Sequence, residues 1–236
     1  MQVQSTLLFE SIEQIYTRVF QDVRPRTAAP EIAVRYCRFA NVNSFIRYSE
    51  GRLEVRIADV LEGAPAPIQE ALAFILIGKL FRKQVADSYG HRYKLWLNRS
   101  DVRRQVSLLR RVRGRKLLNP PQGEFYDLEP MFEDLNLRFF GGLMGRPALG
   151  WSRRPSRTML GHYDPSHHAI VLSKSLDRAD VPRLAVEYVL YHEMLHLRHP
   201  TEHKGVRRCV HTPEFKAAEK LFPGLIEARA ALKRMA

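Results

Sequence analysis

The segment that decides the fold reads Val189-Leu190-Tyr191-His192-Glu193-Met194-Leu195-His196-Leu197, an H-E-x-x-H pattern inside an apolar run. Residues four positions apart share one face of an α-helix, so His192 and His196 can direct imidazole nitrogens at one metal ion. Glu193 lies beside the first of them and can accept a proton from a water whose pKa the metal lowers. The stretch therefore predicts a helical metal site with a general base, on a helix whose apolar side is buried.

A zinc site of this kind needs a third protein ligand and an open fourth position. The pattern in which a histidine follows the second ligand by six residues is excluded, because that position is Glu202. His211 follows His196 by fifteen residues and opens a His-Thr-Pro-Glu-Phe segment, in which Pro213 suits the first turn of a new helix. We predict His211 as the third ligand, with Glu214 as the alternative.

Four further motifs precede the H-E-x-x-H segment in the sequence. They are Leu135-Asn136-Leu137-Arg138-Phe139-Phe140, Leu149-Gly150-Trp151-Ser152-Arg153-Arg154, Gly161-His162-Tyr163 and Ile170-Val171-Leu172-Ser173. Together with H-E-x-x-H and the segment at His211, they resemble the SprT-like (Spartan-type) zinc metallopeptidases over about residues 126–223. Thr212 stands where that family usually has glycine.

The resemblance implies an α+β, zincin-like (minimal gluzincin-type) catalytic domain, with a small antiparallel or mixed sheet packed on the H-E-x-x-H helix. It also implies one Zn²⁺ ion, and it favours His211 over Glu214 as the third ligand. The expected activity is that of a zinc metallopeptidase, which hydrolyses a protein or peptide substrate by a metal-activated water with Glu193 as general base. Tyr163 is a candidate oxyanion or substrate contact, and Ile170–Ser173 is a candidate strand for holding an extended peptide.

Two other functions stay open. The protein could bind nucleic acid with a structural or vestigial zinc site, or it could hydrolyse a bond other than a peptide bond. A structural site has no use for a general base, so Glu193 favours an enzyme. Closed coordination by four protein ligands would favour the nucleic-acid-binding protein.

Positive charge is the strongest feature of the composition. The chain has 38 Lys and Arg against 25 Asp and Glu, a formal net charge of +13, which favours DNA or another polyanion as a partner. Residues 101–116 are predicted as a basic amphipathic helix, because apolar residues recur at helical spacing from Val102 to Val112. The candidate nucleic-acid contacts are Arg103, Arg104, Arg110, Arg111, Arg113, Arg115 and Lys116.

The strongest break in the chain is Asn119-Pro120-Pro121-Gln122-Gly123. It predicts an N-terminal α+β domain over residues 1–118, a linker over 119–123 and the metallopeptidase domain over 124–236.

The order helix, strand, strand, strand, buried helix is predicted on both sides of this break, starting with a helix over Leu7–Phe20 in the first half. We therefore predict an internal duplication. Ile77, Gly78 and Phe81 would then stand where the second copy has its two helix histidines and glutamate, so the first copy would be a degenerate scaffold that holds no metal.

The remaining composition is that of an ordinary globular protein, with 45% hydrophobic and 27% charged residues. The first residues show no signal peptide, and the longest apolar run, Ala71–Gly78, is too short to cross a bilayer. Cys37 and Cys209 show no ligand or disulfide spacing. These features predict a cytoplasmic protein with no membrane partner, and they give no indication of the oligomeric state.

Overall fold

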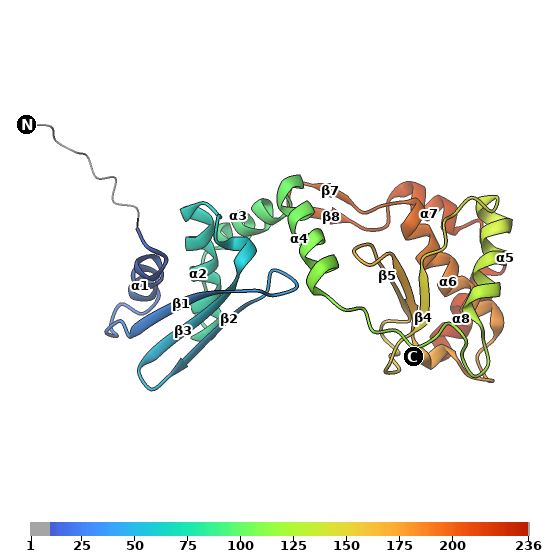
Figure 1. The fold of residues 1–236 in the computed structure, drawn as a ribbon, viewed down its shortest axis with the longest axis horizontal. Coiled ribbons are helices and arrows are strands. Elements are labelled where there is room, and N and C mark those ends of the chain that lie inside the picture. The colour runs from blue at the N-terminus through green and yellow to red at the C-terminus, as the bar shows by residue number, and fades with distance from the viewer. Residues whose placement is uncertain (1–9, 236) are drawn as a thin grey trace, which may run out of the picture. The chain divides into compact units, whose positions relative to one another are not determined.

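The computed structural model describes residues 10–235, and the chain divides into two compact units after Gly114. The first unit contains α1 (Ile12–Val23), β1 (Glu31–Cys37), β2 (Ser44–Ser49), β3 (Arg52–Ala58), the 3-10 helix η1 (Asp59–Leu61), α2 (Ala66–Leu80), α3 (Asp87–Leu97) and α4 (Ser100–Arg113) (Figure 1). The second contains α5 (Leu128–Phe140), β4 (Ala148–Trp151), β5 (Gly161–Asp164), β6 (Ala169–Leu172), η2 (Lys174–Leu176), α6 (Arg183–Arg198), β7 (Glu202–Lys204), β8 (Arg207–Cys209), α7 (Pro213–Glu219) and α8 (Leu225–Met235). The expected α+β class is confirmed.

The first unit is a three-stranded sheet covered by helices. Its strand order is β1-β3-β2, with β1 parallel and β2 antiparallel to β3. Leu53, Val55 and Ile57 alternate along β3 and are buried in one core with residues of α1 and α2. Helix α1 begins at Ile12, and the first residues of the helix predicted from Leu7 lie outside the described part of the chain.

The second unit has a smaller sheet of order β4-β6-β5, again with one parallel and one antiparallel pair. All four residues of β6 are buried, because this strand is paired on both sides and α6 packs on it and on β5. The candidate substrate strand Ile170–Ser173 is therefore wrong, since it falls on the central strand, whereas β5 lies at the edge of the sheet.

The two units share one arrangement. Each runs helix, three strands, 3-10 helix, helix, and each sheet places its third strand in the centre. In the parallel pairs, Glu31 lies opposite Arg52 and Ala148 opposite Ala169, so partner residues are 21 positions apart in both units. Tyr48 lies opposite Leu53 as Tyr163 lies opposite Ile170. The order of elements predicted to recur in both halves is therefore present, and the two sheets also share one strand order.

Residues 119–123, predicted as a linker, belong to the second unit instead. The backbone of Asn119 exchanges hydrogen bonds of 2.9 and 3.3 Å with that of Trp151, which adds a bridge beside β4. The Trp151 indole also donates to the Pro121 carbonyl at 2.9 Å. The proline-rich break thus marks a chain segment that is fixed by sheet-like and side-chain hydrogen bonds.

The loop after this segment is held by a buried aspartate that the sequence did not indicate. The Asp177 carboxylate accepts hydrogen bonds from the backbone N–H groups of Glu124, Phe125 and Tyr126, at 2.7, 2.9 and 3.1 Å. Asp177 is only 6% exposed, so water does not replace these bonds readily. One side chain therefore satisfies three consecutive backbone donors ahead of α5.

We expect Asp177→Ala to lower the free energy of unfolding of the second unit by about 3 kcal/mol, because buried donors left without partners cost about 1–3 kcal/mol. Asp177→Asn keeps one oxygen and should cost roughly half as much. Urea unfolding followed by Trp151 fluorescence, in a Trp96→Phe background, measures both. A loss below about 0.5 kcal/mol for Asp177→Ala would contradict this role.

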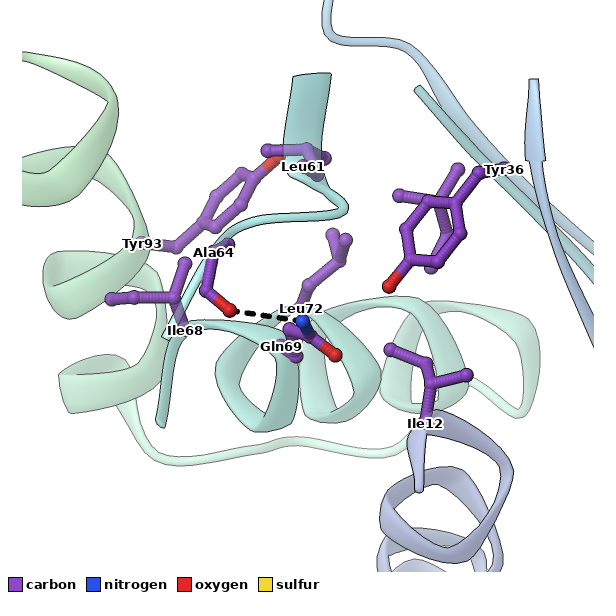
Figure 2. A pocket seen from close by; sticks show the side chains of 9 residues that line it. Ile12, Tyr36, Leu61, Ala64, Ile68, Gln69, Leu72 and Tyr93 are labelled. Carbon is purple, nitrogen blue, oxygen red and sulfur yellow. Dashed lines mark hydrogen bonds between the residues drawn. The ribbon is translucent and has the colours of Figure 1, made fainter. Parts of the chain in front are cut away.

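The first unit also contains a small apolar cavity of about 10 Å³ between α1, α2, α3 and the sheet (Figure 2). Tyr36 and Tyr93 border it, and the Gln69 amide at its wall donates to the Ala64 carbonyl at 2.9 Å. This volume is near the lower limit for a single water molecule, so the cavity is a packing defect and not a ligand site.

Elements not predicted from the sequence are the β7–β8 hairpin, the 3-10 helices η1 and η2, and helices α3 and α8. In the part of the chain described here, residues 10–235, no helix combines the length and apolar character needed to cross a bilayer.

Candidate metal centre

Helix α6 carries the first two candidate ligands. Its apolar side is buried in the core of the second unit, and this fixes the direction in which its polar residues point. His192 and His196 lie one turn apart and are both half-buried, with ring centroids 5.1 Å apart. The helix therefore presents two imidazoles to one point, as the spacing predicted.

The third histidine, His211, lies between the β7–β8 hairpin and the start of α7. Thr212 caps α7 by accepting a hydrogen bond from the Phe215 N–H at 3.2 Å, and Pro213 occupies the first turn. This places the His211 ring 4.9 Å from that of His192 and 5.0 Å from that of His196. Thr212, which departs from the family's usual glycine, thus has a definite role as a helix cap.

One nitrogen from each of His192, His196 and His211 lies within 4.8 Å of the other two, close enough to hold one metal ion. The buried Phe215 ring packs against all three imidazoles, with centroids 5.0, 4.7 and 4.6 Å away. Among residues 10–235 this is the one such group of histidine, cysteine or acidic side chains, and the alternative ligand Glu214 is not part of it.

The chemistry of this donor set fits zinc. Burial lowers the pKa of His192, despite an opposing contribution from the Glu219 carboxylate, and burial together with the other two histidines lowers the pKa of His196 to about 4. Both imidazoles are therefore neutral at physiological pH, which is the form that binds a metal. Among residues 10–235 the cluster contains three imidazoles and no fourth histidine, cysteine or acidic ligand, which resembles catalytic more than structural zinc sites.

The side chain of Glu193 extends from α6 toward β5. It is 5% exposed, and the backbone N–H of Tyr163 donates a hydrogen bond to its carboxylate. A Cβ atom at Gly161 would lie 2.9 Å from a Glu193 oxygen and from Val189, so glycine at this position lets the strand approach the helix. Burial raises the pKa of the Glu193 carboxyl to about 7 in the metal-free protein. This value is near the range in which a general base is most effective.

Tyr163 contacts the Glu193 carboxylate through its backbone N–H and not through its side chain. Its hydroxyl lies 3.2 Å from Nδ1 of His168, and the role of that hydroxyl as an oxyanion contact stays a prediction.

A cleft of about 490 Å³ opens beside His168, between the end of α5 and the end of α6. It is lined by Phe139, Phe140, Leu143, Met144, Gly145, His168, Leu197 and Arg198.

The predicted basic helix is present as α4, but it ends at Arg113, where Gly114 turns into extended backbone. Arg103, Arg104, Arg110 and Arg111 are exposed on it, and the exposed Arg115 lies beyond its end. Its apolar stripe is buried only in part, since Val102 is 4% and Val112 is 74% exposed.

The last two basic candidates have protein partners. Arg113 donates to Asp59 at 2.7 Å and to the Phe39 carbonyl at 3.2 Å. Lys116 lies 2.6 Å from His162 Nε2 and 3.3 Å from Asp164. These two side chains are therefore engaged within their own units, which leaves the exposed arginines as the better candidates for phosphate contacts.

The fold and the three histidines define an α+β domain in which the buried helix α6 carries part of a candidate metal site. Residues 128–225 match the model of the SprT-like family. The predicted resemblance over residues 126–223 is confirmed. No curated protein and no solved structure matches the chain.

Proposed function

We propose that the second unit is a zinc-dependent peptidase in which His192, His196 and His211 hold the metal and Glu193 is the general base. The observation that carries this proposal is the convergence of three imidazoles on one point, two of them on a helix that also carries a buried carboxylate. The match of residues 128–225 to the SprT-like family model supports a metallopeptidase-like hydrolase.

A zinc ion held by three imidazoles supplies Lewis acidity, which lowers the pKa of water and polarises a carbonyl group. Glu193 would accept the proton of the attacking water and later return it to the leaving amine. The Tyr163 N–H holds the Glu193 carboxylate in place, and burial keeps competing solvent away from it. The chain thus contributes a base whose position is fixed by both α6 and β5.

The edge strand β5 is the best candidate for binding an extended peptide. The Ser173 N–H donates to the Leu160 carbonyl at 2.8 Å, so by alternation the backbone groups of Gly161 and the carbonyl of Tyr163 face away from β6. The Tyr163 N–H faces the same way and is bonded to Glu193. A peptide strand can add to such an edge by backbone hydrogen bonds. The cleft beside His168 would accept an apolar side chain of that peptide.

The test is metal-dependent cleavage. After removal of metal with a chelator, we expect the protein to lose cleavage of casein and of a DNA-binding protein, and one equivalent of zinc to restore it. Hydrolysis that persists at full rate in the metal-free protein would contradict the proposal.

We propose in addition that α4 contacts nucleic acid. Arg103 and Arg110 lie seven positions apart, as do Arg104 and Arg111, so the four exposed arginines form two adjacent rows on one side of the helix. No acidic residue interrupts them between Asp101 and Gly114. The alternative function, a nucleic-acid-binding protein with a structural or vestigial zinc site, would use the same surface without hydrolysis.

Replacing all four arginines by alanine should weaken binding of a DNA duplex and reduce its salt dependence. Each phosphate contact contributes about 0.9 to the slope of log K against log salt, so loss of four contacts should reduce the slope by about 3.6. Alanine at Arg153 and Arg154, exposed in the second unit, is the control and should leave the slope unchanged. Equal slopes for the wild type and the four-arginine variant would exclude α4 as the contact.

We also propose that the first unit is a degenerate copy of the second. The common strand order and the common register of the parallel pair support this proposal. Phe81 packs against Phe20 and Tyr48, with ring centroids 5.7 and 6.0 Å away, and a Cβ at Gly78 would lie 2.7 Å from Val85. Under this proposal, aromatic packing in the first unit occupies the region that corresponds to the metal site of the second.

A further inference from the structure

A buried carboxylate stands directly behind the first metal-ligating histidine. Oε1 of Glu219, the last residue of α7, lies 2.7 Å from Nδ1 of His192. Because Nδ1 is occupied by this contact, Nε2 of His192 is the nitrogen directed toward the other two histidines. Glu219 is 9% exposed, so the contact is shielded from water.

Two further side chains hold Glu219 in this position. The Tyr188 hydroxyl, one turn before His192 on α6, donates to Oε1 at 2.9 Å. Arg229 of α8 donates to Oε2 of Glu219 at 3.0 Å and to the Tyr188 hydroxyl at 3.0 Å. Each carboxylate oxygen thus has a partner, and the set joins α6, α7 and α8. Arg229 lies beyond residues 128–225, the part matched by the family model.

We infer that Glu219, fixed by Tyr188 and Arg229, is a positioning residue that holds His192 in the Nδ1–H tautomer with Nε2 free for the metal. A carboxylate that accepts the second ring N–H of a ligating histidine fixes its tautomer and raises its basicity, and its loss lowers metal affinity about 10–100-fold. The inference concerns the same site as the proposed peptidase, but it depends only on metal binding and not on the reaction.

The first measurement is zinc affinity, by competition with a chelator, for the full-length protein and its variants without substrate. We expect Glu219→Ala to raise the Kd for zinc about 10–100-fold. Glu219→Gln keeps a neutral acceptor of the same shape and should raise it less, and it serves if the alanine variant does not fold. Glu227→Gln replaces an exposed carboxylate on α8 by a carboxamide. It is the matched control and should leave the Kd for zinc unchanged.

The second measurement separates positioning from a general structural effect. Long-range ¹H–¹⁵N spectra of the metal-free protein, assigned with His192→Gln, should show His192 as the Nδ1–H tautomer in the wild type. In Glu219→Ala the tautomer should change or become mixed, while the helical circular dichroism stays the same. Arg229→Ala should raise the zinc Kd by less than Glu219→Ala does.

Zinc affinity within twofold of wild type in both Glu219 variants, or an unchanged His192 tautomer in Glu219→Ala, would overturn the inference. If Arg229→Ala leaves the zinc affinity unchanged, α8 takes no part in positioning His192. Absence of peptidase activity in the wild type would contradict the proposed function but leave these zinc and tautomer results as they stand.

Discussion

Glu193→Gln is expected to lower the rate of peptide hydrolysis by about 10²–10⁴-fold, while the protein still binds one zinc ion. The substitution preserves size and the hydrogen bond from the Tyr163 N–H, because the glutamine amide oxygen can accept it. It removes the only function that requires a basic carboxylate, which is acceptance of the proton from water. The loss should therefore appear in kcat, with little change in KM.

The measurement compares cleavage rates and zinc content for wild type, Glu193→Gln and Glu187→Gln. Glu187 lies on the same helix and pairs with Arg183 at 2.7 Å, so its variant controls for replacing a carboxylate on α6. We expect full activity from this control. If Glu193→Gln retains more than about a tenth of wild-type activity with zinc bound, Glu193 is not the general base.

His211→Ala is expected to raise the Kd for zinc more than 100-fold, a larger effect than the 10–100-fold typical of residues that only support a ligand. The alanine removes one of three imidazoles and leaves two nitrogens from a single helix. Activity should be lost together with the metal.

Glu214→Ala distinguishes between the two candidate third ligands. Glu214 is exposed in the first turn of α7 and lies outside the histidine cluster, so its loss should leave zinc affinity unchanged. His203→Ala, in the β7 strand, is a second control for histidine removal. A large loss of zinc affinity in Glu214→Ala, with little change in His211→Ala, would assign the third ligand to Glu214.

The histidine cluster of the candidate metal centre could be predicted because its determinants are local. Spacing on a helix defines the relation between His192 and His196, and Pro213 indicates the helix that holds His211. The order of elements along the chain was predictable in a different way, since the same sequence of elements occurs twice. The cytoplasmic location, the substrate and the nucleic-acid partner stay predictions.

The parts that escaped prediction depend on contacts between distant residues. Glu219 contacts His192 across 27 positions, and Asp177 binds backbone groups more than 50 positions away. A single acidic residue carries no periodic pattern, so nothing in the sequence marks it as buried. The central position of β6 was missed for the same reason, because strand pairing is set by tertiary packing and not by the composition of the strand.

The central claim is that three histidines hold the zinc and leave one position open for catalysis. X-ray absorption at the zinc edge of the loaded protein tests it most directly. The account predicts three imidazole nitrogens at about 2.0–2.1 Å and one additional oxygen donor. Cys209 is exposed two residues before His211, with its sulfur 3.6 Å from the His211 carbonyl, and is the sulfur donor to test for a closed site. A sulfur ligand at about 2.3 Å, or a fourth protein ligand of any kind, would contradict an open catalytic site and favour a structural one.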